Sequence, residues 1–368
     1  MRKGRYFSAK LGLFGRCADS RPFNRPLRLR RKGPVRVTAV RRLKLLFRQR
    51  TPSVRQRRVV APRNCSTRVL ISALLGGLFA NSVLAATHPM TLDEYMTLRG
   101  PQPDIQLAYG PASQQFVQLF NPKGSGPFPV VVLVHGGCFL SKYEGIRQMG
   151  AIAGALAADG IAVWNIEYRR ADEVGGGYPG TFQDISAALR LLVLKAADYR
   201  LDMSRFLVMG HSAGAYLAQW SAGRGNIPEW SPLHEYHPVP IRTVIAAGDL
   251  GQGLRTPKIP GSKTDCGAPG DELLGPLSAP RTEANLDVGI DRLRPNGSHT
   301  IFVVGDSDKY APVSELRAYT ARIKDMHDSA EVLVLPGVSH FDEIAASSPT
   351  WMLLRPVIRR ALGLPTDR

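Results

Sequence analysis

Between residues 115 and 362, short apolar runs typical of strands alternate with longer runs of helical periodicity. The run at 128–135 is apolar almost throughout, as in a strand that is covered on both faces. Strands that alternate with helices at this spacing form a mainly parallel sheet with right-handed crossovers. The sequence therefore predicts an α/β fold with helices on both faces of a central sheet. The predicted strands are 115–120, placed at an edge, 128–135, 161–167, 205–210, 241–247, 300–304 and 331–335.

Helices are expected in the segments between and after these strands. Thr181 is a plausible N-cap of the second helix and Asp184 its third helical position. Two stretches, 223–240 and 248–298, are rich in Pro, Gly and Asp and lack periodicity, and we interpret residues 223–298 as a small cap insert over the strand ends. The predicted helices are 143–158, 182–199, 213–222, 312–326 and 349–362.

A G-x-S-x-G pentapeptide lies between the strand at 205–210 and the helix at 213–222. Its glycines permit a sharp turn that projects the hydroxyl of Ser212 above the sheet, close to the positive end of the following helix. The pattern also occurs by chance, in turns that merely expose a serine to solvent. Its strand and helix flanks favour a nucleophile at Ser212.

A serine nucleophile requires a general base and an acid that orients the base. On this architecture they follow later strands in the order Ser, Asp, His. His340 comes just after the strand at 331–335, and two acids, Asp306 and Asp308, come just after the strand at 300–304. Either acid could instead cap its turn, so the residues alone leave the choice between them open.

The motif His135-Gly-Gly-Cys138 follows the apolar run at 128–135. Glycines let backbone amides approach a substrate and point at a developing negative charge. The amides of Gly137, Cys138 and Ala213 are therefore the candidates for an oxyanion hole, the alternative being an unrelated glycine turn. His234 and His237 have the spacing H-E-Y-H rather than the H-E-x-x-H of a zinc peptidase. No metal or organic cofactor is implied.

Taken together, these motifs make residues 115–365 resemble an α/β-hydrolase of the esterase/lipase branch with an H-G-G-x motif. This group includes hormone-sensitive-lipase-like, kynurenine-formamidase-like and BD-FAE-like (feruloyl/acetyl-xylan-esterase-like) domains, of which the last is most similar. In such relatives the acid follows a glycine by three residues and precedes a proline, which selects Asp308 by alignment on Gly305 and Pro312. The resemblance implies a serine hydrolase acting on a small-molecule or carbohydrate ester. It is carried by residues 135–139, 165–170, 178–184, 210–214 and the two turns with the acid and the histidine.

One position departs from this family pattern, and several other residues are expected to have structural roles. Cys138 stands where many relatives have a third glycine, which keeps an amide N–H but adds a sulfur beside the acyl site. Glu167 and Asp184 are expected to brace the fold rather than bind substrate. Cys138 and Cys266 either form one disulfide or remain separate buried thiols.

The net charge of +18 comes from the N-terminal part of the chain. Residues 1–68 contain 22 basic residues and one acid, whereas 26 basic and 29 acidic residues remain in the rest. The body of the protein therefore lacks the basic surface expected of a nucleic-acid-binding domain.

An uncharged segment, residues 69–86, follows Arg63 and Arg68 and ends in two alanines. This pattern is typical of a secretory signal peptide, and the run is short for a transmembrane helix. We expect an exported protein, periplasmic or secreted, with a signal peptide at 59–86 and a catalytic domain at 87–368; a signal anchor is the alternative. The basic residues 1–58 are either a disordered arm or the result of a misassigned start, with translation beginning near residue 59 or 60.

Three other functions compete with an ester hydrolase. An arylformamidase or a serine peptidase would use the same nucleophile, and a non-catalytic binding protein could keep the same fold. The signal peptide argues against the formamidase, and the length leaves no room for the large extra domain of prolyl-oligopeptidase-type enzymes. The oligomeric state cannot be read from the sequence.

Overall fold

The computed structural model describes residues 88–249, 287–346 and 350–366, all within the second of two units, 1–74 and 75–368, into which the chain divides. The basic extension 1–58, the predicted signal peptide 59–86 and residues 250–286 of the predicted cap insert lie outside the described residues. In the part of the chain that is described, no helix has the length and apolar character needed to cross a membrane.

An eight-stranded sheet, ordered β1-β2-β4-β3-β5-β6-β7-β8, forms the centre of the fold. The six strands from β4 to β8 pair in parallel, and β2 runs antiparallel to both of its neighbours. The predicted α/β fold with a mainly parallel sheet is therefore confirmed. The strands are β1 Ile105–Ala108, β2 Phe116–Phe120, β3 Phe128–Val134, β4 Ala162–Ile166, β5 Leu201–His211, β6 Thr243–Ala247, β7 His299–Gly305 and β8 Ser329–Leu335.

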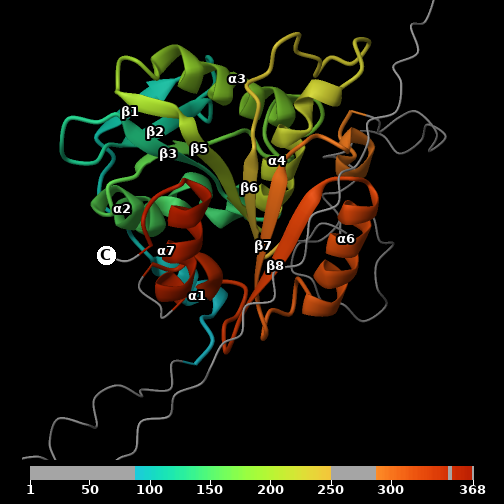
Figure 1. Cartoon of the computed structure of the whole chain (residues 1–368). Coiled ribbons are helices and arrows are strands. Elements are labelled where there is room, and N and C mark those ends of the chain that lie inside the picture. The colour runs from blue at the N-terminus through green and yellow to red at the C-terminus, as the bar shows by residue number, and fades with distance from the viewer. Residues whose placement is uncertain (1–87, 250–286, 347–349, 367–368) are drawn as a thin grey trace, which may run out of the picture. The chain divides into compact units, whose positions relative to one another are not determined.

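Helices cover both faces of this sheet (Figure 1). Alternate residues of β3 show the division: Val132 packs in the cluster that contains α3 and α4, whereas Leu133 packs in the cluster that contains α1, α2 and α7. Helix α6 packs over β7 on the side of α4. Every residue of β3 is buried, and each fully buried valine or leucine side chain contributes about 1.5–3 kcal/mol. The α-helices are α1 Leu92–Thr97, α2 Gly150–Ala158, α3 Gly180–Lys195, α4 Ala213–Ala222, α6 Val313–Asp325 and α7 Thr350–Ala361.

Two predicted elements differ from the structure. The strand at 115–120 is not at the edge, because the short, half-buried β1 pairs outside β2. The helix predicted at 143–158 is α-helical only from Gly150, because Glu144 and Gly145 adopt positive φ angles of 59° and 57°. The preceding residues form 3₁₀ turns instead. The 3₁₀ turns are η1 Ser141–Tyr143, η2 Gly145–Met149, η3 Arg224–Asn226, η4 Ile290–Leu293 and η5 Asp342–Ile344.

The predicted N-cap role of Thr181 is also wrong. Helix α3 begins at Gly180 after Pro179, so Thr181 lies inside its first turn, and its hydroxyl donates to the carbonyl oxygen of Arg169 at 2.5 Å. Asp184 lies beyond the third position of the helix and forms a two-pronged hydrogen bond with the Arg169 guanidinium, at 2.7 and 2.8 Å. These contacts tie the start of α3 to the loop after β4.

Candidate active site

Ser212 occupies the turn between β5 and α4, as the pentapeptide predicts. It is 5% exposed and has φ 54° and ψ −121°, a conformation that is strained for a residue with a side chain. Its backbone N–H donates to the carbonyl oxygen of Ala247 on the neighbouring strand β6, at 2.8 Å. The fold thus holds the turn rigidly against the end of the sheet.

The two glycines of the pentapeptide are required by close backbone approaches. A β-carbon on Gly210 would lie 2.0 Å from the carbonyl oxygen of Gly214, and one on Gly214 would lie 2.1 Å from that of Val134. Both distances are far below van der Waals contact. Helix α4 therefore starts directly against β3, which brings Ser212 next to the loop that follows β3.

The loop after β3 places Gly137 and Cys138 beside Ser212, and these three residues line one pocket. Gly137 and Cys138 have φ angles of 96° and 53°, and a β-carbon on Gly137 would lie 2.9 Å from the Tyr143 β-carbon. Ala213 is the first residue of α4, where a backbone N–H has no intrahelical acceptor. The three predicted oxyanion residues are thus brought together around the serine.

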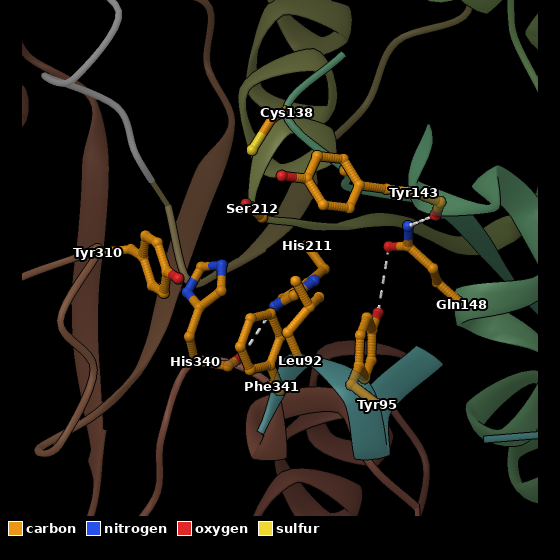
Figure 2. Close-up of a pocket in the computed structure, with 11 residues that line it drawn as sticks. Leu92, Tyr95, Cys138, Tyr143, Gln148, His211, Ser212, Tyr310, His340 and Phe341 are labelled. Atoms are coloured by element: carbon orange, nitrogen blue, oxygen red, sulfur yellow. Dashed lines mark hydrogen bonds between the residues drawn. The ribbon is translucent and has the colours of Figure 1, made fainter. Parts of the chain in front are cut away.

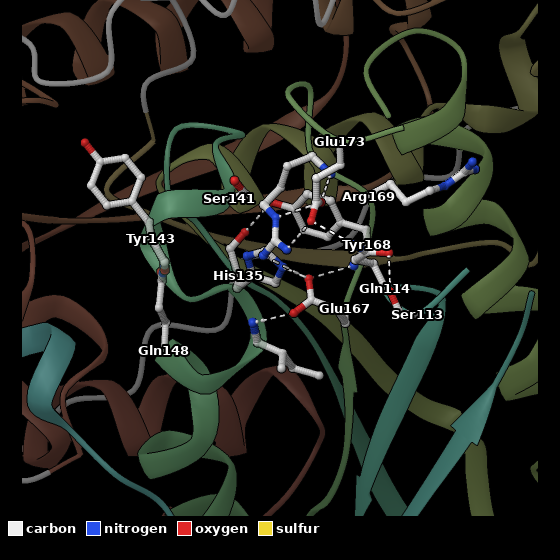
Figure 3. A network of polar contacts seen from close by, with 12 residues as sticks. Ser113, Gln114, His135, Ser141, Tyr143, Gln148, Glu167, Tyr168, Arg169 and Glu173 are labelled. Atoms are coloured by element: carbon white, nitrogen blue, oxygen red, sulfur yellow. Dashed lines mark hydrogen bonds and ion pairs between the residues drawn. The ribbon is translucent and has the colours of Figure 1, made fainter. Parts of the chain in front are cut away.

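A buried polar network supports the loop after β3 (Figure 3). His135 Nε2 lies 2.9 Å from Glu167 Oε1, and the other carboxylate oxygen accepts from the Ile146 N–H at 3.0 Å. The Tyr168 hydroxyl donates to the His135 carbonyl oxygen at 2.9 Å. Burial alone would raise the pKa of Glu167, but His135 and the guanidinium of Arg170, 3.4 Å away, outweigh it and lower that pKa. These contacts agree with a bracing role for Glu167.

His340 and Asp308 meet across the ends of β8 and β7. His340 Nδ1 lies 2.8 Å from Asp308 Oδ2, and both residues are buried. Burial alone would raise the pKa of Asp308, but its hydrogen bond with His340 and the charge of that ring lower the pKa to about 2, helped by the N–H groups of Ala311 and Tyr310. Asp306 is exposed and accepts a hydrogen bond from the Gly337 N–H at 2.8 Å. Of the two candidate acids, the structure brings Asp308 to the histidine.

Two further buried titratable groups, His211 and Glu343, lie beside His340. The Nε2–H of His211 donates to the carbonyl oxygen of His340 at 2.9 Å, because a carbonyl oxygen can only accept. Glu343 accepts a hydrogen bond from the Gly305 N–H at 2.7 Å. Burial raises the pKa of Glu343 well above its ordinary value, and the negative charge of Asp308 adds to this effect.

The same three residues, His211, His340 and Glu343, are the only group in the described ranges with a metal-ligand arrangement, their ligand atoms lying within 4.8 Å of one another. One ring nitrogen of each histidine already has a protein partner: His211 Nε2 binds a carbonyl oxygen and His340 Nδ1 binds Asp308. These hydrogen bonds hold His340 as the imidazole of a pair with the carboxylate of Asp308.

Figure 2 shows Ser212, Cys138 and His340 around one pocket, whose cavity has a volume of about 40 Å³. Most of its other walls were not predicted from the sequence. Cys138 is disulfide-bonded, which excludes a free thiol here, and a pairing with Cys266 lies outside the described residues. Apart from the predicted residues, the pocket is lined by Leu92, Tyr95, Tyr143, Gln148, His211, Tyr310 and Phe341.

Residues 117–245 match the family model BD-FAE. Over 135 residues the chain is 30% identical to a probable isoprenylcysteine alpha-carbonyl methylesterase, ICMEL1, of Arabidopsis thaliana, covering 34% of this chain and 27% of the relative. Over 108 residues it is 38% identical to esterase EstD of Thermotoga maritima, covering 28% of this chain and 26% of that esterase. The chain thus spans only about a quarter to a third of the length of the curated relatives it matches.

Solved structures extend the similarity over most of the described residues. Esterase B from Lactobacillus rhamnosis is similar with a TM-score of 0.59 and 19% identity, over 74% of this chain and 89% of that protein. A truncated carbohydrate esterase from gut microbiota is similar with a TM-score of 0.57 and 16% identity, over 72% of this chain and all of that protein. At these identities, what is shared is the fold.

Proposed function

We propose that this chain, which matches the BD-FAE family model over residues 117–245 and is similar to esterases over part of its length, is a serine hydrolase that cleaves carboxylic esters through a Ser212–His340–Asp308 triad. One observation carries the proposal: His340, hydrogen-bonded to Asp308 at 2.8 Å, lines the same pocket as the strained Ser212. That is the arrangement in which a base can take the proton of a serine hydroxyl while a carboxylate orients the base.

The proposed reaction proceeds through an acyl-enzyme. Ser212 Oγ attacks the ester carbonyl carbon while His340 Nε2 takes the hydroxyl proton, and His340 then returns this proton to the departing alkoxide. Water, deprotonated by His340, attacks the acyl-enzyme carbonyl; the ester bond to Ser212 Oγ breaks, and the proton returns to that oxygen. Asp308 stays ionised throughout and holds the imidazole orientation.

The oxyanion formed in both steps would be stabilised by backbone amides. Ala213 N–H lies at the positive end of α4, and Gly137 and Cys138 line the pocket from the opposite loop. Removal of one preorganised donor of this kind raises the barrier by about 2.7–4 kcal/mol. Small-molecule or carbohydrate esters are the proposed substrates.

Replacing the nucleophile tests this function. Ser212→Ala should abolish hydrolysis of p-nitrophenyl acetate and labelling by a fluorophosphonate, while the thermal unfolding curve shows a folded protein. Ser339→Ala serves as the control and should keep both signals. This half-buried serine directly precedes His340, and its hydroxyl donates to Asp342. Turnover by a folded Ser212→Ala variant would exclude Ser212 as the nucleophile.

We also propose that the protein is exported. The support is the uncharged segment at 69–86, which follows two arginines and ends in two alanines. Mature protein recovered from the periplasm or medium should begin near residue 87 by N-terminal sequencing. Full-length chain confined to the cytoplasm would contradict export without affecting the proposed chemistry.

A further inference from the structure

We propose that Glu343, as a neutral carboxylic acid, donates a hydrogen bond to the carboxylate of Asp308 and so positions the acid of the triad. This inference rests on the proposed function. It concerns a buried side chain that the triad itself does not use. Glu343 lies in η5, three residues after His340, and its side chain is fully buried.

Glu343 connects the two loops that carry the acid and the base. Its Oε1 accepts the N–H of Gly305 at 2.7 Å, and Gly305 is the last residue of β7, three positions before Asp308. Glu343 itself belongs to the turn that follows His340. One carboxyl group therefore ties the backbone that precedes Asp308 to the loop of the histidine.

The second oxygen, Oε2, is directed at the triad. A β-carbon on Gly248 would lie 2.7 Å from Glu343 Oε2 and 2.8 Å from His340 Nδ1, so both atoms border the same small space, which the glycine leaves open. Asp308 Oδ2 lies 2.8 Å from the same His340 Nδ1, and the negative charge of Asp308 is among the causes that raise the pKa of Glu343. Glu343 Oε2 thus lies beside the Asp308–His340 pair.

Only a proton on Glu343 makes this contact favourable. No donor of the described residues reaches Oε2, and two ionised carboxylates close together in a buried site would repel each other strongly. Asp308 already accepts from His340 and from the N–H groups of Tyr310 and Ala311, at 2.8, 2.6 and 3.0 Å. These donors keep Asp308 ionised, so the shared proton belongs to Glu343.

The other titratable groups around Glu343 do not supply a competing proton or cation. The Nε2–H of His211 is used by the His340 carbonyl oxygen. Asp342, next in the chain, is directed away and accepts from the Met90 N–H and the Ser339 hydroxyl. The titratable groups close to Glu343 are those of Asp308 from the loop after β7, His340 from the loop after β8 and His211 from β5, while Asp342 acts on it only through its charge.

Whether the acidic limb of the kcat/KM profile moves in a Glu343→Gln variant distinguishes a neutral Glu343 from an ionised one. Glu343→Gln is neutral and keeps both an acceptor for Gly305 and a donor for Asp308. If Glu343 is neutral, this variant should retain kcat within about threefold and leave the acidic limb of kcat/KM in place. If Glu343 were ionised, its loss would favour a neutral His340 and move that limb down by about one pH unit or more, which would overturn the proposal.

Glu343→Leu removes the donor while keeping an apolar volume. It should lower kcat by about tenfold to a hundredfold, as loss of an outer hydrogen-bonding partner does elsewhere, with little change in KM. A folded Glu343→Leu enzyme with full kcat would overturn the positioning role. Glu331→Gln, on the half-exposed end of β8, is the control and should change neither kcat nor the pH profile.

An infrared measurement keeps the proposal testable without activity. The wild-type protein at pH 7 should show the carbonyl stretch of a protonated carboxylic acid, and this band should be absent from Glu343→Gln and present in Glu331→Gln. Its absence from the wild type would overturn the proposal. If the wild type shows the band but is not labelled by a fluorophosphonate, the protonated carboxyl stands and the proposed function fails.

Discussion

The imidazole of His340 lies 2.8 Å from the carboxylate of Asp308, whereas the carboxylate of Asp306, two residues earlier, accepts the N–H of Gly337. This difference offers a matched pair of variants. Asp308→Asn should lower kcat for p-nitrophenyl acetate by about 10⁴-fold, because an amide at this position favours the wrong imidazole tautomer.

Asp306→Asn is the control for this prediction. Its side chain keeps an oxygen acceptor for the Gly337 N–H, so kcat should stay within about twofold of the wild type. Circular dichroism should show that both variants are folded. If Asp306→Asn were the inactive variant, the choice between the two acids would be reversed.

His211 should make the fold sensitive to mild acid. Burial, together with the neighbouring His340, lowers the pKa of His211 to about 3, whereas an unfolded histidine has a pKa of about 6.5. Between these values the unfolded state binds a proton that the folded state does not, so the free energy of unfolding falls as the pH drops below 6.5. The loss from this group is about 2 kcal/mol at pH 5.

Urea unfolding at pH 7 and pH 5 measures this effect. The drop in the free energy of unfolding between the two pH values should be smaller in His211→Gln than in the wild type by about 2 kcal/mol. His237→Gln, at an exposed histidine, is the control and should behave as the wild type. An equal drop in His211→Gln would show that the acid sensitivity has another source.

Local sequence patterns predicted most of the strands and helices and the order in which the candidate triad residues occur. Ser212 and His340 were found because each follows a strand, and parallel strands bring their ends to one edge of the sheet. The same argument left Asp306 and Asp308 open after β7, and the family resemblance selected Asp308. The first strand was missed because β1 is short and only half buried. Its apolar signal is too weak to stand out from a loop.

Long-range contacts explain what else the sequence did not reveal. Leu92 and Tyr95 line the pocket from α1, far from the other pocket residues in the chain, and nothing in their local pattern indicates this. Glu343 is an acid in a polar segment, and only the fold shows that it is fully buried beside the triad. The 3₁₀ turns at 141–149 arise because Gly145 makes room for the Glu167–Arg170 pair: a β-carbon there would lie 2.2 Å from Arg170 Nη1.

The turn that carries Ser212 should tolerate no side chain at Gly214. A β-carbon there would lie 2.1 Å from the backbone oxygen of Val134, so β3 and α4 would have to separate. Gly214→Ala should lower the free energy of unfolding by about 1–3 kcal/mol or more and reduce esterase activity. Gly225→Ala is the control, because its β-carbon would meet nothing nearer than Pro238 at 4.0 Å; equal stability of the two variants would contradict the close approach.

The pocket beside Ser212 should select short acyl groups. Its cavity of about 40 Å³ is lined by Leu92, Tyr95, Tyr143 and Phe341, and the rings of Tyr95 and Phe341 stack at 5.3 Å. We expect kcat/KM for p-nitrophenyl acetate to exceed that for the octanoate, since the longer chain must displace packed side chains.

Leu92→Ala tests whether these walls set the acyl preference. Leu92 is partly exposed and makes one wall of the pocket, so truncating it should open space at little cost in stability. The ratio of kcat/KM for octanoate to that for acetate should rise by about tenfold, the effect of one or two methylene groups in an apolar pocket. Met352→Ala, at a side chain that is 74% exposed on α7, should leave the ratio unchanged. An unchanged ratio in Leu92→Ala would place the acyl group elsewhere, on the side of the pocket away from α1.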